Sequence, residues 1–502
     1  MKRPALLSLF ATLTIAALAI AAPAPAQTPV PPVRDQSRII DYVQGDQALQ
    51  AALKRTNNTR PAKNIILFIG DGMGINSVTA GRILAGQKRG LDGASYQLSF
   101  ETFPYGGFSK TYSIDNLVTD SANGISAIMT GVKTRNAAIG VDGTITGSRC
   151  RGSLQARLQT LAEAAKLSGR AAGIVTTAGI TDATPVGAYG HTPARGWRSD
   201  IDLTAEAVEN GCTDLARQLV EAPAAIRMDV ALGGDREKFL PDLGAIKGER
   251  ADGRDLTREW SGQTPNAFYA DGLAALQSAR ARNSDHLLGL FSEGDLPSPV
   301  DPEHNNVPDL DQMTASAIDV LSRNPNGFFL MVESASIDKW HHVNNAYRAL
   351  TDVDELSKAV QVALDKTDPN DTLIIVTADH SHGLVLSGYA SRGAPVLGLA
   401  QIDGKPVLDD NGQPYSLLSY ATGPGAKTDD KAPLTEDQVE APDYHQRAMV
   451  YAASAKHAGE DVPVYATGPQ AQLLSGTMES SYIYQVMAYA FGLKSEKPAA
   501  KP

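Results

Sequence analysis

The chain has 502 residues, of which 42% are hydrophobic and 20% charged, a composition typical of a globular protein with ample length for a large core. Its formal net charge of -11 gives an average surface that repels nucleic-acid phosphates and acidic membrane surfaces, so neither is expected as the main partner. A small anion would have to be bound by local positive charge, such as a metal ion or an arginine.

The first 26 residues predict a secretory signal peptide. Lys2 and Arg3 precede an apolar stretch over residues 5–22, and small residues follow up to the A-P-A sequence at 24–26. This order is typical of a signal that is cleaved after Ala26, whereas the Ser and Thr residues in the stretch disfavour an uncleaved membrane anchor. No later segment reaches the roughly 18 apolar residues that a membrane span needs. We therefore expect an exported protein, periplasmic or secreted, with no membrane contact after cleavage.

Short apolar runs alternate with amphipathic patterns through most of the mature sequence. The runs cover residues 64–70, 171–177, 228–234, 286–292, 327–333, 372–378 and 462–468, and helix candidates lie at 153–169, 311–324 and 344–366. Runs that are apolar on both faces and separated by amphipathic helices indicate a largely parallel central sheet with helices on both faces. We expect a doubly wound α/β fold, in which ligands lie beyond the C-terminal ends of the strands.

Three segments depart from this alternation. Residues 384–455 are rich in Gly, Pro, Asp and Tyr and show turn signals with little helical period, so they predict an inserted subdomain. Residues 27–62 are expected to form an N-terminal arm and residues 494–502 a frayed tail. The main domain is then expected to cover residues 63–493.

Charged and imidazole side chains follow several of the predicted strands. Asp71 ends the run at 64–70, Glu333 the run at 327–333, and Asp379 with His380 the run at 372–378. Asp338 and His342 stand four positions apart, which places them on one side of a helix, and His457 lies just before another run. Singly, each is more often a capping or solvated residue. Together at one sheet edge, nitrogen and oxygen ligands favour a zinc site.

Ser121 begins a stretch of small residues with helical potential, SANGISAIMTG. A serine there is ordinarily a helix N-cap. The same position is also where free N–H groups and the helix dipole hold an anion, and a metal ion nearby would make the hydroxyl a nucleophile. The sequence has no G-x-S-x-G motif, which disfavours an ordinary Ser-His-Asp esterase.

Five separated motifs resemble those of the alkaline phosphatases. They are VTDSANGISAIMTGVKTRNAAIGVD, TDATPVGAYGHTPARGWRSD, GFFLMVESASIDKWHH, TLIIVTADHSH and KHAGEDVPVYATGPQA, in the family's order through almost the whole mature chain. The segment before His457 resembles the crown-like insertion of the animal-type members. The resemblance implies two zinc ions, one magnesium ion and a homodimer, with the N-terminal arm and the insertion as contact elements.

The resemblance also implies a role for each matching residue. Ser121 is the expected nucleophile, which becomes phosphoserine, and Arg195 is expected to clamp two phosphoryl oxygens through its planar guanidinium. Asp120 is expected to orient Arg195, while Asp182 and Lys339 tune metal and phosphate binding through water. The implied ligands are Asp338, His342 and His457 for the first zinc ion, Asp71, Asp379 and His380 for the second, and Asp71, Thr184 and Glu333 for magnesium.

Other positions support or depart from the family's pattern. His382 matches a residue that contacts the zinc-bound aspartates and supports them without binding the zinc ion itself. Asn123 and Gly124 stand where small or hydroxyl residues are more familiar, and Trp340 and His341 fill the turn between two ligands. None of these differences removes a ligand.

The chain has two cysteines, Cys150 and Cys212. In an oxidising compartment an even pair usually forms a disulfide, and two free buried thiols are the alternative. Their surroundings resemble a disulfide-bearing region of the animal-type enzymes, which implies the pairing.

The function implied is hydrolysis of small phosphate monoesters by two in-line displacements. One alternative is a phosphodiesterase or sulfatase of the same architecture, although Cys150 lacks the C-x-P-x-R context of a sulfatase. Another is an exported metal- or phosphate-binding protein without catalysis, which would have no use for Ser121 aligned with Arg195.

Overall fold

A computed structural model describes residues 34–244, 247–281, 283–426 and 432–493 of the chain. The predicted signal peptide and the predicted tail lie outside these residues. The chain divides into two units, residues 1–56 and 57–502. The described part of the first unit contains the helix α1 (Ile40–Leu53), which has no buried residue.

The second unit is built around a sheet of ten strands in the described residues. β16 (Val462–Thr467) runs antiparallel to both of its neighbours, and all other neighbouring pairs are parallel. The strand order is β17 (Gly476–Glu479), β2 (Tyr105–Lys110), β16, β8 (Thr372–Thr377), β1 (Asn64–Gly70), β7 (Phe328–Ser334), β3 (Ala171–Gly179), β4 (Val230–Gly234), β6 (His286–Leu290) and β5 (Ala267–Ala270).

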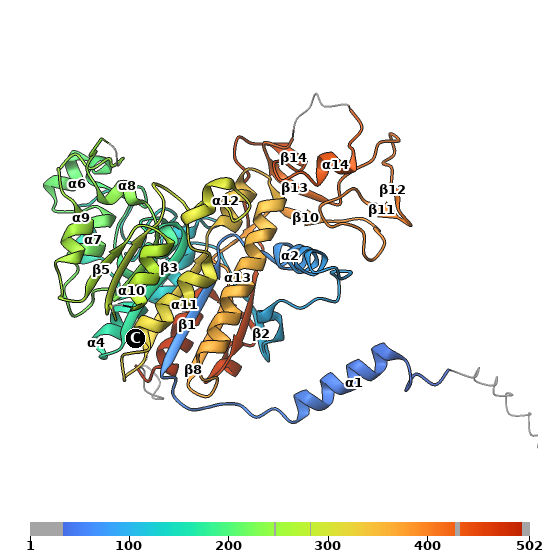
Figure 1. Ribbon diagram of the computed structural model, residues 1–502, viewed down its shortest axis with the longest axis horizontal. Helices are drawn as coiled ribbons and strands as arrows, with labels where there is room; N and C mark the ends of the chain where they lie inside the picture. The colour runs from blue at the N-terminus through green and yellow to red at the C-terminus, as the bar shows by residue number, and fades with distance from the viewer. Residues whose placement is uncertain (1–33, 245–246, 282, 427–431, 494–502) are drawn as a thin grey trace, which may run out of the picture. The chain divides into compact units, whose positions relative to one another are not determined.

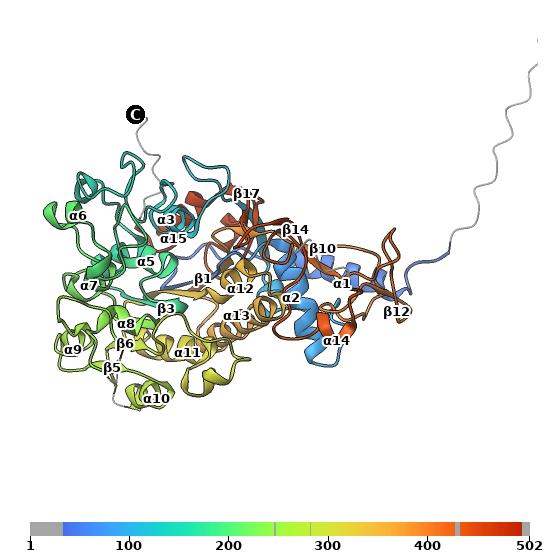
Figure 2. The same cartoon turned by 90° about the horizontal axis from the view of Figure 1, so that it is seen from above.

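Helices cover both faces of this sheet, as Figure 2 shows with β1 and β3 lying between two layers. One layer contains α3 (Ser121–Thr130), α4 (Leu161–Leu167), α5 (Ala183–Tyr189), α7 (Leu215–Glu221), α9 (Leu256–Ser261) and α15 (Ser480–Ala490). The other contains α2 (Ile75–Lys88), α10 (Leu273–Ala281), α11 (Leu310–Leu321) and α13 (Ala346–Lys366), of which α11 and α13 lie in front of the sheet in Figure 1.

The central strands are buried on both faces because each supplies apolar side chains to two cores. In β1, Ile65, Leu67 and Ile69 pack into one core, while Ile66 and Phe68 pack into the other. This two-sided burial is the reason that the strand reads as a continuous apolar run. The expected doubly wound, largely parallel α/β fold is confirmed.

The predicted helix over residues 153–169 is wrong in its first half. A 3₁₀ turn covers Ser153–Gln155, and α4 begins only at Leu161. The Thr160 hydroxyl accepts a hydrogen bond from the backbone N–H of Glu163 at 3.1 Å, and the Glu163 carboxylate accepts one from Thr160 N at 2.9 Å. This capping box fixes the start of the helix, and the T-x-x-E sequence carries its signature.

Residues 384–455 lie largely outside the ten-stranded sheet. They contain a three-stranded sheet of β10 (Leu384–Leu386), β13 (Leu418–Gly423) and β14 (Ala448–Tyr451), and a hairpin of β11 (Gln401–Ile402) with β12 (Lys405–Pro406). The short helix α14 (Glu436–Val439) belongs to the same segment. The insertion is therefore rich in short strands and turns, and its likeness to a crown stays a prediction.

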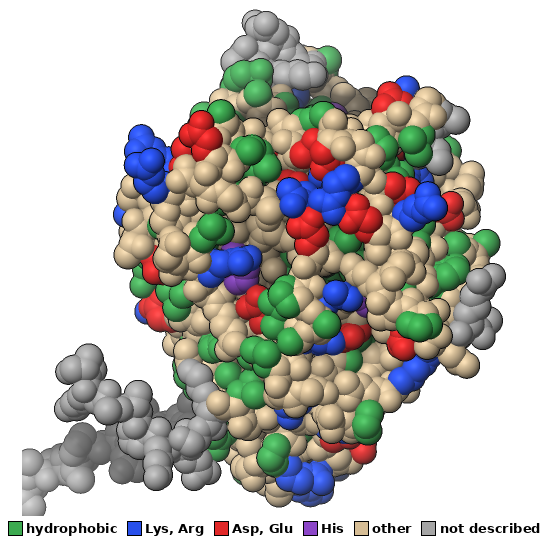
Figure 3. Space-filling view, turned by 90° about the vertical axis from the view of Figure 1, so that its left-hand side faces the viewer, with side chains coloured by type: hydrophobic (Ala, Val, Ile, Leu, Met, Phe, Trp, Pro, Cys, Tyr) green, Lys and Arg blue, Asp and Glu red, His purple; other side chains and the backbone are tan. Residues whose placement is uncertain are grey.

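The surface drawn in Figure 3 carries acidic and basic side chains interspersed with one another. The net negative charge is thus not gathered into one acidic field on this face. In the described part of the chain, no helix combines the length and the apolar character that crossing a membrane requires.

Candidate active site

The sheet brings the predicted strand-end residues together because their strands are neighbours. β1 lies between β8 and β7, and Ile69 is in register with Thr377 on one side and with Glu333 on the other. Asp71 follows β1 and Asp379 follows β8, so both lie at the edge where Glu333 ends its apolar run. The site thus forms at the C-terminal edge of the parallel strands, as expected for this architecture.

A first group of metal-capable side chains consists of Asp338, His342, His382 and His457. Asp338 and His342 share one face of α12 (Ser336–His342), and Nε2 of His342 lies 3.2 Å from Oδ2 of Asp338. Nε2 of His457 lies 3.3 Å from Nε2 of His342 and 3.6 Å from Oδ1 of Asp338. The predicted helical spacing of Asp338 and His342 is therefore observed.

The two facing imidazoles of His342 and His457 are placed so that a cation between them could bind both rings. Nδ1 of His342 lies 2.8 Å from the Ala455 carbonyl oxygen, and Nδ1 of His457 lies 3.0 Å from the Thr119 carbonyl oxygen. If each Nδ1 donates its proton to a carbonyl oxygen, each neutral ring presents a lone pair at Nε2, and the two lone pairs point at each other. In metal-binding histidines, the ring nitrogen that does not bind the metal ion usually donates a hydrogen bond to an oxygen such as a backbone carbonyl.

A second group consists of Asp71, Asp338 and His380. Nε2 of His380 lies 3.2 Å from Oδ1 of Asp71, 3.4 Å from Oδ2 of Asp379 and 3.1 Å from the Ser121 hydroxyl. Asp379 also accepts hydrogen bonds through Oδ1 from the backbone N–H groups of Gly72 and His380. The nucleophile candidate and the second set of predicted ligands are therefore in contact.

Several buried polar atoms of both groups have no hydrogen-bond partner among the described residues. They include Oδ1 of Asp338, Oδ2 of Asp379 and both ring nitrogens of His382. Nε2 of His382 lies only 2.8 Å from Oδ1 of Asp338, but the two atoms are not aligned for a hydrogen bond. A buried polar atom without a hydrogen-bond partner destabilises the fold. Side chains that point at one another without forming hydrogen bonds are typical of the ligands of a shared metal ion. The residues present therefore fit metal ions.

The charges of the site lead to the same conclusion. Burial and the neighbouring carboxylate of Asp71 raise the pKa values of Glu333 and Asp379 well above the ordinary range. Burial acts to lower the pKa of His380, but Asp379 and Asp71 outweigh it and raise this pKa to about 10. For His457, burial and His380 lower the pKa to about 2. The buried carboxylates together thus lack positive charge, which divalent ions would supply.

Thr184, Glu333 and Asp71 form a third part of the site. The Thr184 hydroxyl donates to Oδ2 of Asp71 at 3.3 Å, and Oε2 of Glu333 accepts a hydrogen bond from Thr176 at 2.5 Å. All three predicted ligands are buried. Oxygen-only surroundings of this kind suit magnesium.

Arg195, the predicted phosphate clamp, lies in a network of ion pairs. Its guanidinium contacts Asp182 at 3.1 Å and Asp120 at 3.5 Å, and Asp182 pairs through its other oxygen with Lys339 at 2.5 Å. Burial acts against ionisation of Asp182, but Lys339, Arg198 and Arg195 hold its pKa below the ordinary value. Four of these residues were predicted from the sequence, whereas Arg198 lies in one of the five motifs without a predicted role.

Asp120, and not Ser121, is the N-cap of α3. Oδ1 of Asp120 accepts from the backbone N–H of Asn123 at 3.2 Å, which leaves the Ser121 hydroxyl free to face His380. The unfamiliar residues of this helix have structural reasons. Asn123 bonds Thr119 and Thr134 N, and a Cβ at Gly124 would stand 2.8 Å from the Asp379 carbonyl oxygen.

His341 stays outside both metal-capable groups. Its Nε2 contacts the Ser77 hydroxyl at 2.9 Å and its Nδ1 the Tyr420 hydroxyl at 2.7 Å. A fully buried histidine with both nitrogens partnered is part of the core.

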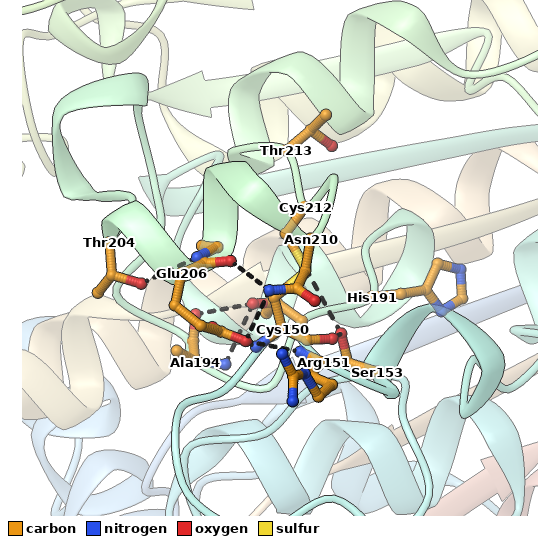
Figure 4. Close-up of a disulfide and its surroundings, with 12 residues drawn as sticks. Cys150, Arg151, Ser153, His191, Ala194, Thr204, Glu206, Asn210, Cys212 and Thr213 are labelled. Atoms are coloured by element: carbon orange, nitrogen blue, oxygen red, sulfur yellow. Dashed lines mark hydrogen bonds between the residues drawn. A yellow bond between two sulfur atoms is a disulfide. The ribbon is translucent and has the colours of Figure 1, made fainter.

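The predicted disulfide between Cys150 and Cys212 is confirmed (Figure 4). Cys150, Ala194, Trp197 and Ala207 form a small buried cluster, against which Cys212 packs. Because Ala194 and Trp197 flank Arg195, the disulfide supports the segment that carries the phosphate-clamp candidate.

Comparison with known proteins identifies the protein family in which this site occurs. A sequence profile of the family described as alkaline phosphatase matches residues 62–493. The chain belongs to the alkaline phosphatase family. The resemblance seen in the sequence is confirmed, and the chain is an enzyme, a hydrolase, which decides against a non-catalytic binding protein.

Relatives of this alkaline phosphatase align over most of its length. The tissue-nonspecific isozyme of Gallus gallus is 39% identical over 462 residues, which are 89% of this chain and 88% of the relative. The alkaline phosphatase of Gadus morhua is 39% identical over 449 residues, covering 87% of this chain and 93% of the relative.

Solved structures support the fold. The alkaline phosphatase from the Antarctic bacterium TAB5 gives a TM-score of 0.61 at 24% identity, covering 86% of this chain and 99% of that one. The Thermus thermophilus enzyme gives a TM-score of 0.63 at 23% identity, covering 89% of this chain and 95% of that one.

Proposed function

We propose that this enzyme hydrolyses phosphate monoesters to alcohol and inorganic phosphate through a phosphoserine at Ser121. The observation that carries the proposal is the position of the Ser121 hydroxyl. It is buried, lies 3.1 Å from Nε2 of His380, and stands at the first residue of α3, beside the Asp120 that contacts Arg195. The proposed nucleophile and the proposed anion clamp therefore both lie close to the metal-capable groups, near the N-terminus of α3.

Two zinc ions and one magnesium ion fit the side chains described above. Asp338, His342 and His457 would hold the first zinc ion, with His382 orienting Asp338. The second zinc ion would be held by Asp71, Asp379 and His380, and magnesium by Asp71, Thr184 and Glu333. When bound, such ions lower the pKa of a hydroxyl or water and neutralise charge on the phosphoryl group.

The side chains of the protein then have definite tasks. Arg195 binds two phosphoryl oxygens, and Asp120 and Asp182 hold its guanidinium in position. The oxygen of Ser121 attacks phosphorus, the bond between phosphorus and the alcohol oxygen breaks, and the alcohol leaves with a proton. A water molecule then attacks phosphorus from the vacated side, the bond between phosphorus and the Ser121 oxygen breaks, and that oxygen takes up a proton from the water as phosphate is released. The N–H groups at the start of α3 favour the anion throughout.

Lys339 and Asp182 act on the phosphate indirectly in this proposal. Lys339 adds positive charge near Arg195, and Asp182 forms an ion pair with each of these two side chains. Since recognition centres on the phosphoryl group, the alcohol contributes little to specificity.

Release of p-nitrophenol from its phosphate ester at alkaline pH, with and without a chelator, tests the proposal. Turnover should require metal and should be lost in Ser121→Ala. Metal-replete protein that shows no turnover would rule the proposal out. A bis-ester substrate separates the alternative of a phosphodiesterase, which the combination of Arg195, Thr184 and Glu333 disfavours.

We also propose that the enzyme is exported and forms a homodimer through the N-terminal arm and the insertion. Within the insertion, β14 is an edge strand whose Met449, Val450 and Tyr451 side chains are exposed, a surface that another chain can cover. Light scattering on the purified protein gives its mass in solution, and N-terminal sequencing of the exported form locates the cleavage after Ala26.

A further inference from the structure

Lys339 lies between two carboxylates and not beside one. Its Nζ is 2.5 Å from Oδ2 of Asp182 and 3.4 Å from Oδ2 of Asp295. Asp182 belongs to the site that the sequence predicts, whereas Asp295 follows β6 in a segment without a motif. The positive charge of Lys339 is therefore shared between the phosphate site and a residue outside it.

Asp295 is fixed to the end of a core strand. Its Oδ1 accepts a hydrogen bond from the backbone N–H of Gly179, the last residue of β3, at 2.9 Å. The next residue, Leu296, donates its N–H to the Thr177 carbonyl oxygen at 2.9 Å. One carboxylate oxygen thus holds the backbone, and the other is left to face Lys339.

The surroundings of Gly179 keep this attachment in place. A Cβ at Gly179 would meet the carboxylate of Asp235 at 2.0 Å, so no larger residue fits there without displacement. Asp235 is itself held by Arg198 at 2.8 Å and by the Thr181 hydroxyl at 2.5 Å. The backbone attachment of Asp295 is therefore held in place by close packing, and its second carboxylate oxygen faces Lys339 from a fixed position.

The position of Asp295 has an electrostatic consequence for the bound anion. Arg195 and Lys339 both contact Asp182, one at each oxygen, so the ammonium group of Lys339 lies next to the guanidinium that is proposed to bind phosphate. A second carboxylate on Lys339 competes with a bound phosphate for the charge of the ammonium group and also repels the anion.

We propose that Asp295 is a positioning residue that restrains Lys339 and so limits how tightly the enzyme holds its phosphate product. This inference rests on the proposed role of Lys339 in phosphate binding. Tight product binding slows turnover when release is limiting, so a restraint on the lysine favours release.

The decisive variant is Asp295→Asn, because the amide oxygen can still accept the Gly179 N–H while the negative charge facing Lys339 is removed. The side chains of Lys339 and Asp295 are 35% and 40% exposed, so solvent weakens their interaction. We expect the inhibition constant for inorganic phosphate and the KM to fall by about two- to fivefold, the range of a partly exposed ion pair. Thermal unfolding of the same metal-replete protein checks that the fold is kept.

Two further variants show whether the effect passes through Lys339. Glu293→Gln removes the same charge from an exposed residue two positions away and should leave phosphate inhibition unchanged. In a Lys339→Ala background, Asp295→Asn should have no further effect, since residues that act through one another are not additive.

Three results would overturn the inference. Phosphate inhibition that is unchanged or weaker in Asp295→Asn contradicts the restraint. An equal effect in the Lys339→Ala background shows that Asp295 acts on the anion directly. If Lys339→Ala alone leaves phosphate inhibition unchanged, the proposed role of Lys339 fails together with the inference, whereas the first two results leave that role standing.

Discussion

The hydroxyl oxygen of Ser121 lies 3.1 Å from Nε2 of His380, although 259 positions separate the two residues in the chain. The contact exists because α3 packs with its N-terminus over the C-terminal end of β8. It joins the predicted nucleophile to the predicted ligands of one metal ion, and the predictions below depend on it.

Replacement of Ser121 by alanine should abolish turnover while leaving the metal content unchanged, because the variant removes the proposed nucleophile and none of the proposed ligands. We expect a loss of at least about a thousandfold in kcat, as for other nucleophile deletions. Hydrolysis of p-nitrophenyl phosphate and elemental analysis of the purified variant check both parts. Ser168→Ala, at an exposed position after α4, is the matched control and should be fully active.

Gly124→Ala should lower activity by more than about tenfold. The added methyl group would stand 2.8 Å from the Asp379 carbonyl oxygen and 2.9 Å from its Cβ, so α3 or the end of β8 must move. Movement of that size displaces Ser121 from His380, and catalysis is sensitive to such shifts. Steady-state kinetics give the loss. Gly262→Ala, where the added carbon would meet only ordinary contacts at 3.6 Å, should leave the kinetics unaltered.

Removal of metal should reduce stability as well as activity. Asp71, Asp338, Asp379 and Glu333 are at most 5% exposed and lie near one another, so their negative charges repel when no cation is present. Ligands present at about a hundred times their dissociation constant stabilise by about 2.7 kcal/mol each, so chelation should lower the unfolding temperature by several degrees. Calorimetry before and after chelation, and again after zinc and magnesium are restored, measures this. An unchanged unfolding temperature would contradict the proposed ligation.

Loss of the disulfide should weaken both the fold and the phosphate clamp. The bond between Cys150 and Cys212 spans 62 positions, for which the chain-entropy model gives about 4 kcal/mol as an upper value. The double variant Cys150→Ser, Cys212→Ser should therefore unfold at lower urea concentration. It should also show a higher KM, because Ala194 and Trp197 lose their packing beside Arg195. A lower stability with an unaltered KM would show that the disulfide does not support the clamp.

The pH dependence of the free energy of unfolding should include a contribution from His286, which is not one of the proposed metal ligands. Its ring stacks on Trp260 at 3.9 Å, and burial lowers its pKa to about 4 from the ordinary 6.5. The unfolded chain thus binds this proton more readily than the folded protein, so stability is present above pH 6.5 and is lost as the pH falls toward 4. The loss is at most about 3 kcal/mol.

Urea unfolding of His286→Phe beside the parent enzyme at pH 8 and pH 5 isolates this contribution. The phenyl ring keeps the stacking and cannot bind a proton, so the difference in stability between the two pH values should be smaller in the variant. Equal differences in both proteins would show that His286 does not titrate in this way.

The strands and their ends could be predicted because their signals are local. Seven apolar runs correspond to seven strands, and Asp71, Glu333 and Asp379 stand where those runs end. In contrast, the other three strands of the sheet, β2, β5 and β17, were not predicted. β2 has two glycines in YGGFSK and mixed burial, while β5 and β17 have only four residues each, so none of them shows a long apolar run.

Contacts between distant segments could not be read from the sequence. Asp295 lies outside the five motifs and Arg198 lies in one without a predicted role, and only the fold places them beside Lys339 and Asp235. His341 and His342 are adjacent in the chain, yet one faces Ser77 and Tyr420 and the other the metal-capable group. The helical period separates their directions, but only the tertiary structure shows what each direction meets.

The pairing of β9 (Ser381–His382) with β15 (His457–Ala458) brings the two ends of the insertion together at the candidate site. The chain leaves the site just after His382 and returns at His457, and these two residues are direct antiparallel partners. The intervening segment is thus a closed loop whose two ends meet at one point. Parts of this segment away from Tyr420 and Ala455, which contact His341 and His342, can change in length at little cost to loop closure, since closure depends only weakly on length. A displacement of the insertion would reach the candidate site through His382, His457 and His342.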